Sequence, residues 1–192
     1  MRLMKKGCLL RSTEKGQIGW TAGFWIFLFW GILLCSLLQM EIFRSSAQYL
    51  EDALAASNLA AAIIDVEEYG VSHRIQIEDV YTARLRCIAA MKANLGLDAN
   101  WECTNQSLIS GPVHMVNFTV YNVDEENVEV YSFDENGVMY SGTGTLGSVR
   151  APNGVMVEST GIYSEIVYRV KGFPGIETDA HKGKLVDIVM CE

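Results

Sequence analysis

The stretch from Gln17 to Met40 reads QIGWTAGFWIFLFWGILLCSLLQM and contains no charged residue. A helix of these 24 residues is about 36 Å long, which is enough to cross a hydrocarbon core of about 30 Å. Trp20 lies near its start, where an indole ring can anchor at the membrane interface. A cleaved secretory signal is the alternative, but its apolar part is shorter, about 7–15 residues, and ends in small residues. This stretch instead continues as Met40-Glu41-Ile42-Phe43-Arg44. We therefore predict a retained transmembrane helix over residues 17–40.

The charges on the two sides of this stretch differ in sign. Residues 1–16 contain five Lys and Arg and one Glu, a net charge of +4. Residues 41–192 contain 10 Lys and Arg against 22 Asp and Glu, a net charge of −12. Because Lys and Arg are retained on the cytoplasmic side, we predict a cytoplasmic N-terminus and an extracytoplasmic C-terminal part. The acidity of that part argues against a nucleic-acid partner bound through its phosphates.

The residues after the apolar stretch favour a continued helix. The segment Ile42–Val66 has no Gly or Pro and contains seven Ala residues, which gives it a high helix propensity. An apolar stripe runs along it, and Gly70 offers a C-terminal stop. The stripe consists of Leu50, Leu54, Leu59 and Ile63. We predict one helix from about residue 18 to about residue 67, whose outer half packs on its own head or on neighbouring copies. An ordinary Ala-rich core helix after a short break is the alternative.

The remaining sequence predicts an α+β head. Helical spacing of apolar residues predicts a second helix over Glu78–Leu95, ended by Gly96. Alternating patterns then predict six strands, and the Gly-rich segment Gly142–Gly147 is expected to be a connecting loop. The strands are expected at Val113–Val123, Asn127–Phe133, Val138–Tyr140, Val155–Glu158, Gly161–Lys171 and Lys184–Met190. Such an order favours a mainly antiparallel sheet.

These patterns divide the chain into four parts. Residues 1–16 are a basic cytoplasmic leader, and residues 17–40 are the transmembrane helix. Residues 41–70 are an Ala-rich helical extension, and residues 71–192 are the extracytoplasmic α+β head.

The start of the chain resembles a known group of bacterial proteins. A basic leader ending in Lys15-Gly16, an uncharged helix, an Ala-rich extension and a β-rich head together resemble a prepilin. Residues 15–66 are similar to the TadE/TadG-like proteins of tight-adherence pili and related secretion systems. Those proteins tend to open with a Gly-Gln or Gly-Ala step, like Gly16-Gln17, and continue into an Ala-rich helix, like Gln48–Ala62. The resemblance implies a pilin-like fold and leader processing between Gly16 and Gln17. It also implies a place in the bacterial inner membrane, with the lipid bilayer and pilin-like or secretion-system membrane proteins as partners.

One position departs from the pilin pattern. Type IV pilins carry Glu five residues after the processed Gly, and the residue at that position is Thr21. The departure implies an accessory pseudopilin rather than a polymerising subunit. The function expected from the resemblance is a non-enzymatic, single-pass role in a pilus, secretion or conjugation assembly. The alternative is a membrane-anchored extracytoplasmic binding or sensing module unrelated to pili.

The cysteines indicate at most a structural bond. Cys35 lies in the apolar stretch, where a thiol behaves as a small apolar group. Outside it, Cys87 and Cys103 flank the end of the second predicted helix, and a disulfide between them is feasible. Pairing of Cys103 with Cys191 is the second possibility. No C-x-x-C pattern occurs, so neither a zinc ribbon nor a redox motif is supported.

Other chemistry-bearing residues form no recognisable site. His73, His114 and His181 each lack a second ligand at helical or strand spacing. Ser110 precedes His114, but a nucleophile elbow is absent, and the Gly142–Gly147 segment lacks the Lys of a phosphate loop. We therefore expect no catalytic residue, no metal, no cofactor and no small-molecule substrate.

Overall fold

The structure is a computed structural model, and it describes residues 10–64, 66–72, 74–104, 109–172 and 175–189. The chain forms two compact units, Met1–Ile42 and Phe43–Glu192, which we name the anchor unit and the head unit. The helices are α1 (Leu10–Ala61), α2 (Val66–Ser72) and α3 (Val80–Leu95). The strands are β1 (Ile109–Asp124), β2 (Asn127–Asp134), β3 (Met139–Thr145), β4 (Gly161–Lys171) and β5 (Glu177–Asp187).

The described part of the anchor unit is helical and belongs to α1. Its apolar side chains face outward rather than into a protein core, with Trp20 84% and Phe27 78% exposed. Within the described residues, this helix is long and apolar enough to cross a membrane, and its apolar stretch has no buried residue. The arrangement fits a helix whose solvent is lipid, because 18 or more consecutive apolar residues on a water-exposed surface would be costly. The prediction of a single-pass membrane helix is thus supported by length, composition and exposure.

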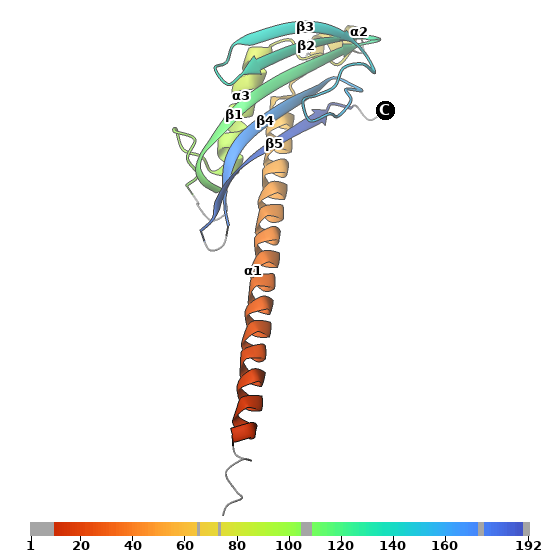
Figure 1. Ribbon diagram of the computed structural model, residues 1–192. Coiled ribbons are helices and arrows are strands. Elements are labelled where there is room, and N and C mark those ends of the chain that lie inside the picture. Colours follow the sequence, from red (N-terminus) through yellow and green to blue (C-terminus); the bar gives the residue numbers. More distant parts are fainter. Residues whose placement is uncertain (1–9, 65, 73, 105–108, 173–174, 190–192) are drawn as a thin grey trace, which may run out of the picture. The chain divides into compact units, whose positions relative to one another are not determined.

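The head unit is built on a five-stranded sheet with strand order β3-β2-β1-β4-β5 (Figure 1). All four neighbouring pairs are antiparallel, and β1 is the central strand. The alternation that predicted a strand over Gly161–Lys171 has the bounds of β4, and the strand expected over Asn127–Phe133 is β2. The predicted α+β class with a mainly antiparallel sheet is confirmed.

Two predictions for the chain between β2 and β4 were wrong. The strand expected over Val138–Tyr140 is longer, because β3 includes Gly142–Thr145 of the segment expected as a loop, and Val155–Glu158 is not a strand. A side chain at Gly144 would overlap Val149, so glycine here allows the β3–β4 connection to fold back tightly over the strand. Val157 is instead buried in this connection. Its apolar side chain packs in the core, although its backbone belongs to no strand of the sheet. The head therefore has five described strands, not six.

The last strand also begins earlier than predicted. The expected strand was Lys184–Met190, whereas β5 pairs with β4 from Glu177 to Asp187. Most residues of its first half are exposed polar or charged side chains, so apolar alternation could not reveal them. Their pairing is imposed by the hydrogen bonds of the β4–β5 hairpin. Met190 lies outside the described residues.

The helices pack on one face of the sheet. Tyr81 of α3 contacts the Phe133 ring of β2 at a centroid distance of 5.2 Å, and the Phe43–Ala61 part of α1 lies against β4 and β5. The second helix predicted over Glu78–Leu95 is confirmed as α3. Its ends carry the expected signals, since Asp79 accepts a hydrogen bond from the Thr82 amide and Gly96 adopts φ 62° as the C-cap.

The end of α1 differs from the sequence prediction. The helix ends at Ala61 rather than near residue 67, and α2 starts a new helix at Val66. No Gly or Pro marks this end. The following chain returns to the sheet, where the Thr160 hydroxyl donates to the Ile75 carbonyl at 2.7 Å and the Asn122 side chain bonds both the amide and the carbonyl of Ile77. These long-range bonds require a change of direction that local propensity does not encode.

The opposite face of the sheet has a smaller core. Tyr121, Tyr163 and Leu185 of the sheet are buried there together with Ala151 and Val157 of the β3–β4 connection. The head sheet is therefore covered on both faces, by helices on one and by a folded connection on part of the other.

Candidate functional site

An ion cluster joins α1 to the last strand of the head. Lys182 Nζ lies 2.7 Å from Glu51 Oε2, and Lys184 Nζ lies 2.8 Å from Glu51 Oε1. Both lysines are on β5, where alternate residues share a face. The three side chains are only partly buried. These ion pairs therefore help to fix where α1 lies on the sheet more than they raise the free energy of unfolding.

A buried amide fixes the same two elements seven residues further along α1. Asn58 is 0% exposed, and its Nδ2 donates to the Ile162 carbonyl at 3.2 Å and the Lys184 carbonyl at 2.9 Å. Its Oδ1 accepts from the Ser164 hydroxyl at 2.7 Å and from the Cys87 thiol at 3.5 Å. One side chain therefore connects α1, α3, β4 and β5. We name Asn58, Cys87 and Ser164 the Asn58 cluster.

A third polar contact joins α1 directly to α3. Asn94 Nδ2 donates to Ser57 Oγ at 3.2 Å, and the Tyr49 hydroxyl donates to the Asn94 carbonyl at 2.9 Å. These bonds align α1 with α3. Taken with the Asn58 cluster, they show that the Ala-rich extension packs on its own head, which was one of the two expected arrangements.

The proposed Cys87–Cys103 disulfide is not formed in this structure. The Cys87 thiol points into the Asn58 cluster, whereas Cys103 follows the C-cap of α3 and donates to the Leu95 carbonyl at 3.5 Å. The two thiols are thus buried against different partners. Cys191, the alternative partner of Cys103, lies outside the described residues.

Burial makes the Cys87 thiol unreactive. Desolvation raises the pKa of Cys87 to about 12, so at pH 8 about 10⁻⁴ of this thiol is the nucleophilic thiolate. We expect iodoacetamide to leave Cys87 unmodified at pH 8 in the folded protein and to modify it in 8 M urea, as read by peptide mass spectrometry. Equal labelling with and without urea would contradict the buried position, and the exposed Ser45→Cys variant serves as the positive control.

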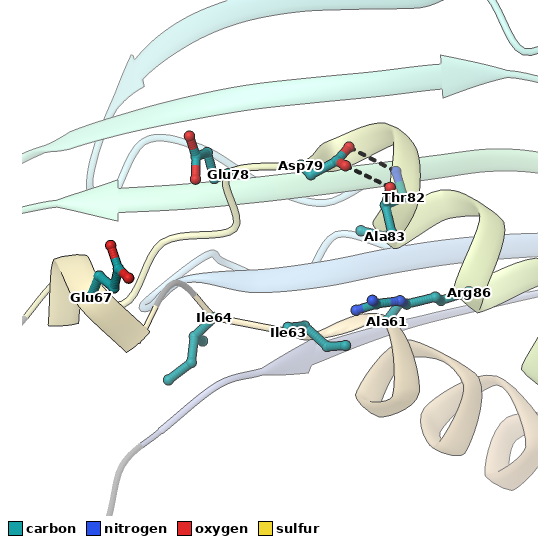
Figure 2. A pocket seen from close by; sticks show the side chains of 9 residues that line it. All are labelled: Ala61, Ile63, Ile64, Glu67, Glu78, Asp79, Thr82, Ala83 and Arg86. Atoms are coloured by element: carbon teal, nitrogen blue, oxygen red, sulfur yellow. Dashed lines mark hydrogen bonds between the residues drawn. The ribbon is translucent and has the colours of Figure 1, made fainter.

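A cleft of about 490 Å³ opens at the junction of α1, α2 and α3 (Figure 2). It is lined by Ala61, Ile63, Ile64, Glu67, Glu78, Asp79, Thr82, Ala83 and Arg86. The alanines and isoleucines form apolar walls, and the charged side chains come from α2, from the approach to α3 and from α3 itself. Figure 2 shows the Arg86 side chain running between the end of α1 and the first turn of α3.

The polar groups in this cleft are engaged in local structure. The Asp79 carboxylate accepts hydrogen bonds from the Thr82 amide and hydroxyl, and these bonds lower the pKa of Asp79. The Thr82 hydroxyl therefore donates to the carboxylate that caps α3. No thiol or imidazole is among the lining residues. The cleft has the size of a binding site for a small molecule or a peptide side chain.

The remaining residues singled out in the sequence lie apart from the cleft. Gly16 and Gln17 lie within α1. Ser110 is buried in β1, and His114 is exposed on the same strand. His181 Nδ1 lies 3.8 Å from Glu165 Oε1 on the sheet. Among the described residues, no group of three or more His, Cys, Asp and Glu side chains is arranged to hold a metal ion. His73 lies outside the described residues.

Sequence reasoning missed the Asn58 cluster and the Glu51 ion cluster. A signal for the first was present, because Asn58 follows Leu50 and Leu54 at helical spacing and so lies on the apolar stripe of α1. A polar residue on such a stripe is buried and needs partners. Its strand partners lie more than 100 residues away, and a single sequence does not identify them.

Comparison with known proteins identifies no relative: no family model, no curated protein and no solved structure matches this chain.

Proposed function

We propose that this chain is a non-enzymatic, single-pass bacterial envelope protein of the pilin-like, TadE/TadG-like type, acting as an accessory pseudopilin in a pilus, secretion or conjugation assembly. The observation that carries the proposal is the double character of α1. Within the described residues, its apolar part has no buried side chain, while Phe43–Ala61 packs on an antiparallel sheet through Asn58 and Glu51. A pilin-like subunit needs this combination, since one helix must serve lipid or neighbouring helices and also support a head.

The charge distribution supports an orientation for this protein. The leader carries +4 and residues 41–192 carry −12, so the positive-inside rule favours a cytoplasmic leader and a head outside the inner membrane. Thr21 replaces the Glu of polymerising pilins. This replacement removes the carboxylate that would meet a neighbouring subunit's N-terminus, and it supports an accessory role.

The experiment combines intact-mass analysis with a gene deletion. We expect the protein extracted from membranes to lack residues 1–16, and the Gly16→Leu variant to retain them. The matched Gly19→Leu variant, with a change three residues downstream, is expected to be processed like the wild type. We also expect the deletion strain to lose filaments or secretion and to regain them with the wild-type gene. An intact leader together with unaltered filaments and secretion would overturn the proposal; an intact leader with an assembly defect would remove only the processing step.

A membrane-anchored binding module is the second candidate function. It is favoured by the cleft of about 490 Å³, whose apolar walls and charged rim lie in the head unit. This candidate requires the head to bind its ligand without other envelope proteins. It would be favoured if the deletion strain assembled normally and substitutions at Ile63 and Arg86 produced the same phenotype as the deletion.

A further inference from the structure

The two edges of the head sheet differ in how they are protected. The β5 edge carries six charged or histidine residues among its eleven. Alternating charges of this kind discourage another strand from pairing with an edge. The β3 edge carries none, and the chain is free of charge from residue 136 to residue 149. In a head unit with a net charge of −11, this uncharged edge is a local exception.

The hydrogen-bond register shows which groups of β3 face outward. The Leu146 amide donates to the Glu126 carbonyl at 2.8 Å, and the Asp134 amide donates to the Val138 carbonyl at 3.1 Å. Hydrogen-bonded and non-bonded positions alternate in an antiparallel pair, so Gly142 and Gly144 bond to β2 across their register. The amides and carbonyls of Ser141 and Thr143 therefore point away from the sheet.

These outward groups are accessible. Residues 140–143 are exposed, and Figure 1 shows β3 as the outermost strand of the sheet. Gly142 has no atom near the position of a Cβ, so side chains do not shield the backbone there. Among the described residues, no hydrogen bond engages the outward amides of Ser141 and Thr143.

We propose that the β3 edge of the head is a docking site for an extended, non-acidic segment of another envelope protein, which adds as a sixth strand. A row of alternating amides and carbonyls is matched by the backbone of another strand, as in other cases of strand addition. The absence of charge on the edge places no requirement on the side chains of that segment. The acidic head, however, disfavours an acidic one.

A second copy of this chain is a less suitable occupant. Each copy carries a net charge of −11 on its head unit, with 10 Lys and Arg against 21 Asp and Glu. Pairing two heads edge to edge brings these like charges together, and their repulsion opposes it. That the partner is an envelope protein rests on the proposed membrane anchoring, whereas the exposed edge does not.

The test is hydrogen exchange of the full-length protein at single-residue resolution, in membranes of the producing strain and after purification in micelles. We expect the Ser141 and Thr143 amides to exchange about tenfold or more slowly in the membranes than in the purified protein. The Thr143→Pro variant removes one outward amide without touching the bonds to β2, and it should abolish the protection of Ser141. Thr143→Val keeps the amide and should behave like the wild type.

Each result supports or overturns the proposal. Equal exchange of the Ser141 and Thr143 amides in the two preparations overturns it. If these amides become more protected as the purified protein is concentrated, the edge binds a second copy, and the proposed partner is wrong. If the Gly142 and Gly144 amides also exchange faster in Thr143→Pro, the pairing of β3 with β2 has frayed. The Thr143→Lys variant, which places a charge on the edge, is then judged by whether it abolishes the protection of Ser141. A failure here leaves leader processing and the deletion phenotype untouched, so it is distinguishable from a failure of the proposed function.

Discussion

The double substitution Phe27→Asp/Ile32→Asp is expected to release the protein from the membrane. Both side chains are more than half exposed in the apolar part of α1, and both lie near the middle of the uncharged stretch. A charged residue at the centre of a transmembrane helix costs about 3 kcal/mol on insertion scales, and the lost apolar residue adds about 0.5 kcal/mol. Two substitutions therefore remove about 7 kcal/mol of insertion free energy, which exceeds the margin that a helix containing Gly, Ser and Thr can spare.

The measurement is the fraction of protein that stays in the membrane pellet after an alkaline carbonate wash. The wild type should remain almost wholly in the pellet, whereas the doubly charged variant should move to the supernatant or be degraded. The matched control Phe27→Leu/Ile32→Leu keeps the stretch apolar and should remain in the pellet. Retention of the charged variant at the wild-type level would show that the apolar part of α1 is buried against protein instead of lipid.

Local signals explain which parts of the head could be predicted from the sequence. The bounds of β4 follow from alternation alone, because every second residue from Ile162 to Val170 belongs to one face. The end of α3 follows from Gly96, which supplies the left-handed conformation that a helix C-cap requires. The transmembrane stretch is also local, since composition over 24 residues determines its preference for lipid. In each case the physical cause lies within a few turns or residues of the feature.

The parts that could not be predicted depend on distant partners. Gly144 indicates a loop by propensity, yet it pairs with Val128 of β2, and Val149 packs where its side chain would be. The first half of β5 has polar residues that pair only because β4 precedes it in a hairpin. The candidate disulfide between Cys87 and Cys103 was plausible by spacing, but Cys87 faces Asn58 across the helix pair. Spacing along the chain does not determine the direction of a side chain about a helix end.

The Asn58→Leu substitution is expected to lower the free energy of unfolding of the head by about 3 kcal/mol. Leucine fits a similar volume but cannot replace the four hydrogen bonds that Asn58 makes. The Ser164 hydroxyl and the Cys87 thiol, both 0% exposed, lose their acceptor Asn58 Oδ1, and each buried unsatisfied group costs about 1–3 kcal/mol. The added apolar burial offsets part of this cost, so the expected loss is below the sum.

The exposed Gln48→Leu substitution on the same helix is the matched control, and it should change stability by less than about 0.5 kcal/mol. Unfolding is read in full-length protein by pulse proteolysis in increasing urea, which cleaves the unfolded head while the anchor unit stays in the micelle. Similar urea midpoints for Asn58→Leu and Gln48→Leu would contradict the role assigned to the buried amide.

A double-mutant cycle with Ser164→Ala separates the hydrogen bond from general disruption. The Ser164 hydroxyl donates to Asn58 Oδ1 at 2.7 Å, so removing both partners eliminates an unsatisfied group that either single variant leaves behind. The double variant should therefore be more stable than the sum of the single effects predicts, by about 1 kcal/mol. Additive effects would mean that Asn58 acts through its strand carbonyls alone. A positive coupling would place the Asn58 cluster, with its contacts to α3 and β4, at the junction that holds α1 to the head.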